Sequence, residues 1–275
     1  MNPEKRQKDL QRLRGMRPID DDFMRCLFKD NIQLVQMVLR IIMEKPDLII
    51  TDCQTQKDMK RLAGARSICL DAYGTDSTGK KYDIEIQRAD KGADPHRARY
   101  HSSILDIENL DAGQDFRELP DTFTIFITEA DFGGEGKPFY LIQRMNVTTG
   151  KPFDDGAYIL YVNGEYRGDS AIGKLMHDFN CTTANEMNFE LMAERTRYLK
   201  ENPKGVEEMC RIIEEMRNEE RAESRTETLL DAIKNLVESM GITAEQAMTA
   251  LKIPEDEHRK YMDMLSGSQS TVAGV

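Results

Sequence analysis

Residues 67–87 read SICLDAYGTDSTGKKYDIEIQ and contain the clearest structural pattern in the chain. Two strand-like runs, Ser67–Gly74 and Tyr82–Gln87, flank a segment of Thr, Asp, Ser, Gly and Lys that is rich in turn-forming residues. A pair of such runs joined by a short polar segment is typical of a β-hairpin. The pattern therefore predicts two antiparallel strands here.

The predicted hairpin brings acidic residues together. Folding it about the turn at Asp76–Gly79 pairs residues whose numbers sum to about 155 or 156, so that Asp71 lies beside Glu85 within one position. Side chains alternate along a strand, which places Asp83, Glu85 and Gln87 on one face and the apolar residues of the second strand on the other.

This cluster of Asp71, Glu85 and Gln87 allows two interpretations. Neighbouring carboxylates repel each other, so a partly buried pair requires a cation, and Mg²⁺ favours such oxygen ligands. A bound metal could polarise a phosphodiester and activate water, with Gln87 orienting that water. Alternatively, Asp83, Glu85 and Gln87 are only the solvent-exposed face of a half-buried strand.

The remaining segments predict a mixed α/β core. Residues 20–42 have helical spacing with a break near Asp30–Asn31, and Thr122–Thr128 is a buried strand. Phe139–Met145 and Ala157–Val162 are further strand candidates.

Residues 95–112 predict a helix that Pro95 opens. The apolar side chains expected to pack inward are Tyr100, Ile104, Ile107 and Leu110. His96 and His101 lie five residues apart without a Cys or His partner, so we do not predict a zinc site.

The charge balance limits the partners of the chain. Its 275 residues include 38 Lys or Arg and 49 Asp or Glu, a net charge of −11, which excludes a general nucleic-acid coat. Positive charge gathers in residues 1–17 and around Arg88–Arg99, where a local DNA contact remains open.

The apolar and cysteine patterns predict a cytoplasmic protein without a membrane partner. No apolar run approaches the roughly 20 residues of a membrane span, and the basic N-terminus lacks the apolar segment of a secretory signal. The five cysteines are far apart and predict reduced thiols.

Four regions are predicted along the chain. Residues 1–17 form a flexible basic arm, 18–168 the core, 169–265 a helical C-terminal region and 266–275 a disordered tail. In the helical region, the charged run Glu190–Arg225 predicts one long solvated helix.

The end of the helical region resembles a helix–turn–helix. Thr243 and Gln246 predict a capping box, and Pro254 marks the start of a second helix. Acidic residues 255–257 begin that helix and disfavour docking to DNA. We therefore expect these helices to pack or to form a homo-oligomer.

Longer segments extend the pattern beyond the hairpin. They are DDFMRCLFKDN (residues 21–31), DMKRLAGARSICLDAYGTD (58–76), RARYHSSILDIENLDAGQDFRELP (97–120), TFTIFITEADFG (122–133), GKPFYLIQRMN (136–146) and ILYVNGEYRGD (159–169). In this order they resemble the PD-(D/E)XK nuclease family transposases, also described as recombination-promoting nucleases. The resemblance covers roughly residues 19–220.

The resemblance implies a restriction-endonuclease-like fold, a central mixed sheet flanked by helices, with a helical C-terminal extension. It also implies a Mg²⁺-dependent endodeoxyribonuclease linked to transposition or recombination, with Mn²⁺ as a possible substitute and DNA as the partner. Asp71 and Glu85 match the metal ligands of the motif. Gln87 matches its third position, where the wider superfamily most often has Lys.

Other candidates lie near this motif. Asp22 matches an additional metal-binding acid of related nucleases, or is simply an acid at a helix N-terminus. Arg88, Arg97, Arg99 and Tyr100 are candidates for phosphate contacts, since guanidinium groups match phosphate oxygens. The alternative function is a catalytically weak or inactive mobile-element protein that binds DNA or another protein.

Overall fold

The computed structural model describes residues 3–58, 69–87 and 93–269. Within them the helices are α1 (Pro3–Gly15), α2 (Asp21–Phe28), α3 (Ile32–Ile42), α4 (Pro95–Glu108), α5 (Ala171–Asn180), α6 (Glu190–Glu201), α7 (Pro203–Met240), α8 (Ala244–Ala250) and α9 (Glu255–Gln269). The strands are β1 (Ile50–Asp58), β2 (Cys69–Asp76), β3 (Lys81–Gln87), β4 (Thr122–Thr128), β5 (Phe139–Ile142), β6 (Met145–Asn146), β7 (Lys151–Pro152) and β8 (Ala157–Asn163).

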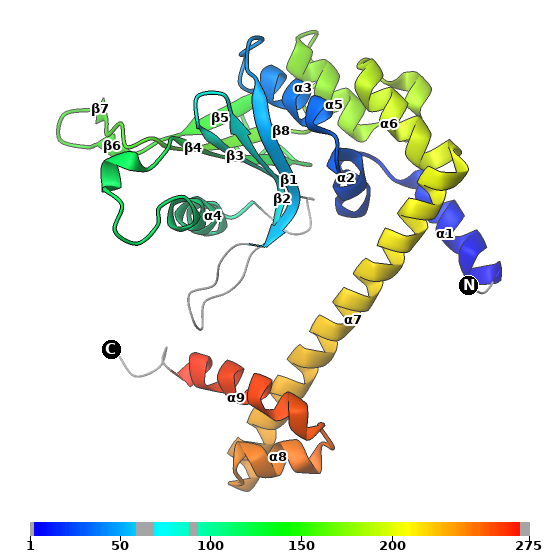
Figure 1. The fold of residues 1–275 in the computed structure, drawn as a ribbon, viewed down its shortest axis with the longest axis vertical. Helices are drawn as coiled ribbons and strands as arrows, with labels where there is room; N and C mark the ends of the chain where they lie inside the picture. The colour runs from blue at the N-terminus through cyan, green and yellow to red at the C-terminus, as the bar shows by residue number, and fades with distance from the viewer. Residues whose placement is uncertain (1–2, 59–68, 88–92, 270–275) are drawn as a thin grey trace. The chain divides into compact units, whose positions relative to one another are not determined.

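A six-stranded mixed sheet forms the centre of the fold, in the order β1-β2-β3-β4-β8-β5. Strands β3, β4 and β8 run parallel, and the outer pairings are antiparallel. Helix α4 connects β3 to β4 and covers one face, while α2, α3 and α5 lie on the other side of the sheet (Figure 1). This arrangement confirms the predicted α/β class, a central mixed sheet flanked by helices with a helical C-terminal extension.

The β2–β3 hairpin is confirmed with the register that the sequence predicts. Ala72 pairs with Ile84 and Tyr73 with Asp83, so paired residue numbers sum to 156. The Asp76 carboxylate fixes the turn, because its Oδ1 accepts hydrogen bonds from the backbone N–H groups of Thr78 (2.8 Å) and Lys80 (3.1 Å). Gly79 adopts a φ of 88°, in the left-handed region that favours glycine.

The two faces of the sheet have different chemistry. On one face Tyr82, Ile84 and Ile86 of β3 are buried in a large apolar core with residues of α2 and α3. On the α4 face the apolar clusters are small: Tyr73 packs with Leu105, and a separate group holds Ala98, Phe126 and Tyr161. Polar groups therefore fill more of the space beneath α4.

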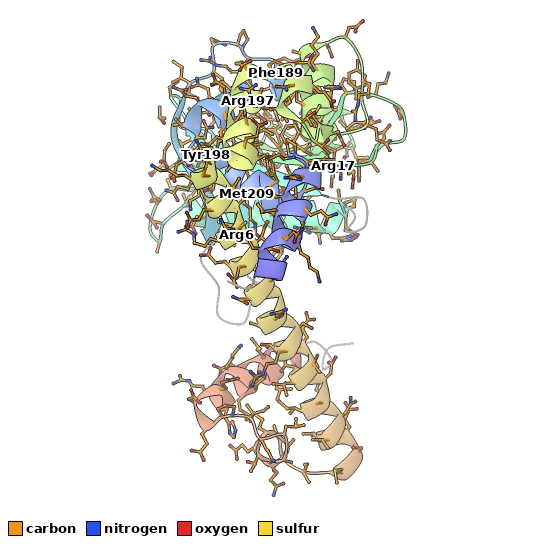
Figure 2. All side chains as sticks on the ribbon, turned by 90° about the vertical axis from the view of Figure 1, so that its right-hand side faces the viewer. Arg6, Arg17, Phe189, Arg197, Tyr198 and Met209 are labelled. Carbon is orange, nitrogen blue, oxygen red and sulfur yellow. The ribbon has the colours of Figure 1, made fainter. Side chains whose placement is uncertain are left out.

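The N-terminus differs from the predicted flexible arm. Residues Pro3–Gly15 form α1, and Leu13 and Met16 are buried in the same apolar core as Met209 of α7; the side chains of this region are drawn in Figure 2. The Lys200 ammonium donates a hydrogen bond to the Met16 carbonyl at 2.5 Å. Two buried side chains and this bond give the basic segment a fixed position that its narrow apolar face does not reveal.

Other segments also depart from the prediction. The charged run Glu190–Arg225 lies in two helices rather than one, because Pro203 cannot continue α6 and instead begins α7. The edge strand β1 has no counterpart among the predicted strands. Helix α9 extends to Gln269, and residues 270–275 of the predicted tail lie outside the described residues.

The chain divides into two compact units, and the division falls between Ile213 and Glu214, within α7. The predicted boundary lay after residue 168, but α5 and α6 bury side chains such as Phe179 and Met192 in the core of the first unit.

The second unit has its own small core, which contains Ile233, Met248 and Tyr261. The predicted capping box is confirmed, because Thr243 Oγ1 accepts from the Gln246 N–H at 3.2 Å and Gln246 Oε1 from the Thr243 N–H at 3.0 Å. Among the described helices of the whole chain, none has the length and apolar character that crossing a membrane requires.

Candidate metal centre

The acidic residues of β3 are buried on the α4 face. Asp83 is 0% exposed and Glu85 is 2% exposed. Strand β3 lies between β2 and β4, where Asp83 pairs with Thr124 and Glu85 with Phe126. The interpretation of these residues as a solvent-exposed face is therefore wrong for Asp83 and Glu85.

Asp71 lies on the neighbouring strand β2, and Gln87 lies at the end of β3 itself. Extending the β2–β3 register by one pair places Asp71 opposite Glu85, and Gln87 is the last residue of β3, paired with Thr128 of β4. The side chains of Asp71 and Gln87 lie outside the described part of the structure, as does the whole of Arg88.

Helix α4 supplies the other side of the cluster. The Asp94 carboxylate accepts a hydrogen bond from the His96 N–H at 2.6 Å and caps the helix, whose first residue is Pro95. The residues buried along α4 are Ala98, His101, Ser102 and Leu105. This spacing of three and four residues defines the face toward the sheet.

The predicted inward face of α4 is accordingly wrong in part. Ile107 is 46% exposed, and Tyr100 and Ile104 are only half-buried. The helix is rotated by about one residue from the predicted orientation, because the sheet face beneath it carries acidic and aromatic groups that accommodate His101 and Ser102.

The structure brings His101 to the two acids. Its Nδ1 lies 3.6 Å from Asp83 Oδ2 and 3.7 Å from Glu85 Oε1. One donor atom from each of these three residues lies within 4.8 Å of the others. The sequence prediction missed His101, although its position three residues after Ala98 and four before Leu105 was a signal that it shares the buried face.

The Asp83 carboxylate and the ring nitrogen Nδ1 of His101 are buried without hydrogen bonds among the described residues. Burial raises the pKa of Asp83, and His101 opposes that shift. The distances to His101 exceed those of a good hydrogen bond, so the buried acid lacks the contacts that usually stabilise such a group.

The candidate phosphate-binding residues on α4 have different neighbours. Arg97 Nη2 lies 3.7 Å from Glu85 Oε2, and its side chain is 41% exposed. Arg99 instead lines a largely apolar cavity of about 330 Å³ together with Phe132, Arg144 and Tyr161. Tyr100 is half-buried. The structure thus brings Arg97, but not Arg99, into contact range of Glu85.

Asp22 has a different neighbour. Its Oδ2 lies 2.6 Å from Arg12 Nη2 of α1, and its helix α2 packs against the apolar face of the sheet. Asp22 is not a member of the group formed by Asp83, Glu85 and His101.

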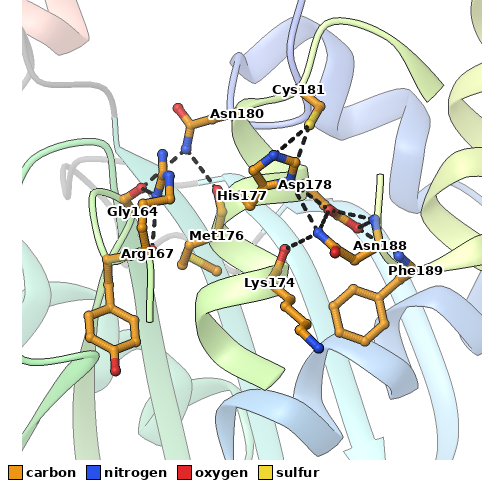
Figure 3. A network of polar contacts seen from close by, with 11 residues as sticks. Gly164, Arg167, Lys174, Met176, His177, Asp178, Asn180, Cys181, Asn188 and Phe189 are labelled. Carbon is orange, nitrogen blue, oxygen red and sulfur yellow. Dashed lines mark hydrogen bonds and ion pairs between the residues drawn. The ribbon is translucent and has the colours of Figure 1, made fainter. Parts of the chain in front are cut away.

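A second group of metal-binding residue types occurs at the end of α5, where His177, Asp178 and Cys181 lie close together (Figure 3). Asp178 is fully buried, and its oxygens accept hydrogen bonds from the backbone N–H groups of Asn188 and Phe189 and from the Asn188 side chain, all at 2.8 Å. These donors lie at the start of α6, so Asp178 satisfies backbone groups that a helix N-terminus leaves open.

Burial raises the pKa of the Cys181 thiol to about 11, which keeps the metal-binding thiolate form scarce at neutral pH. Cys26, Cys53 and Cys181 are free thiols. The hydrogen bonds of Asp178 to the start of α6 give this group a structural role.

Comparison with known proteins gave one family match. The model of the family described as "PD-(D/E)XK nuclease family transposase" matches residues 29–239, which is most of the chain and includes the sheet, α4 and most of α7. No curated protein and no solved structure matched the chain.

Proposed function

Because the chain belongs to the PD-(D/E)XK nuclease family transposases, we propose that it is a Mg²⁺-dependent endodeoxyribonuclease that acts in transposition or recombination. Mn²⁺ is expected to substitute for Mg²⁺. Asp71 and Glu85 hold the metal, and the Gln87 amide orients the attacking water. When bound, the metal supplies Lewis-acid stabilisation of the phosphate and lowers the pKa of water.

The observation that carries this proposal is the register of the β2–β3 hairpin. Extending this register by one pair beyond Ala72–Ile84 pairs Asp71 with Glu85, whose carboxylate lies beside His101 of α4, and this supports the proposal. Directly opposite residues in an antiparallel pair have Cβ atoms about 4.5–5.5 Å apart. Two carboxylates at that separation suit the coordination of one hard cation.

Arg97 is the favoured phosphate contact among the arginines. It is partly exposed and stands beside Glu85, so its guanidinium can reach both the cluster and a ligand from solvent. It also brings positive charge to a motif whose third position is Gln rather than Lys. Asp22 remains a proposed additional acid, and Arg88 and Tyr100 remain proposed DNA contacts.

A plasmid-nicking assay with Mg²⁺ or Mn²⁺ tests the proposal. Asp71→Ala and Glu85→Gln should each lower the cleavage rate by about 100-fold or more, because metal stabilisation of the transition state contributes several kcal/mol. Asp52→Asn is the matched control, since Asp52 is an exposed acid on the neighbouring strand β1. Undiminished cleavage by Asp71→Ala would refute the assignment of the site.

The alternative is a catalytically weak or inactive mobile-element protein that binds DNA or another protein. Gln87 supports it, because an amide adds no positive charge at the third motif position. Absence of cleavage by wild type, combined with DNA affinity that falls steeply with salt, would favour this alternative. We also propose that the protein forms a homo-oligomer through α8 and α9. The mass of the protein in solution tests this proposal.

A further inference from the structure

We propose that Asp83, Glu85 and His101 form a binding site for a first-row transition-metal dication beneath α4, in which His101 supplies a nitrogen ligand. The site shares Glu85 with the proposed nuclease centre, but it uses two residues outside that motif. Metal binding here does not require that the protein cleave DNA.

The spacing of the donor atoms supports a shared cation. His101 Nδ1 lies 3.6 Å from the nearest Asp83 oxygen and 3.7 Å from the nearest Glu85 oxygen. These distances are too long for strong hydrogen bonds. Two metal–ligand bonds of about 2.1 Å each can span up to about 4.2 Å, so one ion can contact both members of either pair.

The burial of Asp83 also supports a bound cation beside Glu85 and His101. Its side chain is 0% exposed, and within the described residues its oxygens accept no hydrogen bond. A buried carboxylate in that state is unfavourable unless a proton or a cation neutralises it. Arg97 is 41% exposed, and its Nη2 lies 3.7 Å from Glu85 Oε2.

The donor types indicate the class of metal. Mg²⁺ favours oxygen ligands and rarely uses imidazole, whereas manganese, iron and zinc accept carboxylate and imidazole together. A site with two carboxylates and one imidazole should therefore hold Mn²⁺ in the presence of excess Mg²⁺.

A buried ion pair between Asp83 and a protonated His101 is the competing explanation. An ion pair would stabilise the protein without metal, and removal of one partner from it is strongly destabilising. If the residues form a metal site instead, their contribution to the free energy of unfolding should depend on added metal.

The test is Mn²⁺ binding by the full chain, followed by electron paramagnetic resonance. Wild type should bind Mn²⁺ with nitrogen modulation in the pulsed spectrum. His101→Gln should lose that signal, and both His101→Gln and Asp83→Asn should weaken Mn²⁺ binding by about tenfold or more. His96→Gln is the matched control, because His96 is an exposed histidine on the same helix.

Asp71→Ala separates this inference from the proposed nuclease. If both proposals hold, Asp71→Ala loses cleavage but keeps the nitrogen-coordinated Mn²⁺. Nitrogen modulation that survives in His101→Gln overturns the inference and leaves the nuclease proposal intact. Absence of nitrogen-coordinated Mn²⁺ in wild type overturns it as well. Thermal unfolding without metal confirms that His101→Gln and Asp83→Asn are folded.

Discussion

Asp83 on β3 and Asp178 on α5 are both completely buried and both lie beside a histidine. Their hydrogen bonding differs. Asp178 accepts bonds from two backbone N–H groups and one side-chain amide, all at 2.8 Å, and holds the start of α6 (Figure 3). Asp83 accepts none among the described residues.

Proximity of a carboxylate to a histidine is therefore weak evidence of a binding site. What distinguishes the two positions is whether the protein itself satisfies the carboxylate, since buried polar groups are normally bonded. Asp178 contributes to stability through those bonds. Asp83 is left available for a ligand, and the following substitutions test that distinction.

The largest effect is expected for Asp178→Ala. Removal of the carboxylate leaves the part-buried N–H groups of Asn188 and Phe189 without their acceptor, at about 1–3 kcal/mol each. The free energy of unfolding should fall by about 3–5 kcal/mol, measured by urea denaturation. Glu186→Gln, an exposed acid in the same region, should be neutral. A loss below about 1 kcal/mol would contradict the structural role of Asp178.

Asp83→Asn should have the opposite consequence when metal is absent. The substitution removes a buried charge without removing a bond that the described residues make, so the free energy of unfolding should be unchanged or up to about 2 kcal/mol higher. Urea denaturation in the presence of a chelator measures it. A decrease comparable to that of Asp178→Ala would show that the two aspartates do not differ.

Asn188→Ala, which removes one of the hydrogen bonds to Asp178, should lower the free energy of unfolding less than Asp178→Ala does. It removes the amide that donates to Asp178 Oδ1, while the backbone donors of Asn188 and Phe189 remain. Because Asn188 is exposed, we expect a loss of about 1 kcal/mol in thermal or urea unfolding. A loss as large as that of Asp178→Ala would mean that the side-chain amide, not the backbone, dominates the contact.

His177→Gln should change least. His177 is 45% exposed, and Asp178 keeps its backbone partners without it. The free energy of unfolding should change by about 0.5 kcal/mol or less. Added Zn²⁺ should shift the melting temperatures of wild type and variant equally, because the Asp178 oxygens already accept hydrogen bonds from the protein. A Zn²⁺ shift lost only in the variant would identify a metal site there.

Local patterns predicted much of the fold. The hairpin around Asp76–Gly79, the buried strand at Thr122–Thr128 and the Thr243 capping box depend on short-range residue choices, and all three are confirmed. The docking of α1 was not predictable in this way. It depends on an apolar core that also contains Leu199 and Met209, which lie far away in sequence.

The sequence predicted which residues of β3 share a face, but it did not predict which face of α4 is buried. Period-two alternation correctly grouped Asp83 with Glu85 on one face. On α4, the apolar residues Ile104 and Ile107 suggested one face, but the sheet beneath is polar enough to bury His101 instead. Helix orientation depends on the partner surface, and the sequence of the helix alone does not contain that information.

The connection of β3 to β4 through α4 has a consequence for folding. Asp83, Glu85 and His101 all lie within one strand and the helix that follows it, with an 18-residue separation between the first and the last. Contacts over so short a loop have a small closure entropy and favour rapid formation. We therefore expect the cluster to assemble once β3 and α4 meet, before the more distant C-terminal helices complete the opposite side of the core.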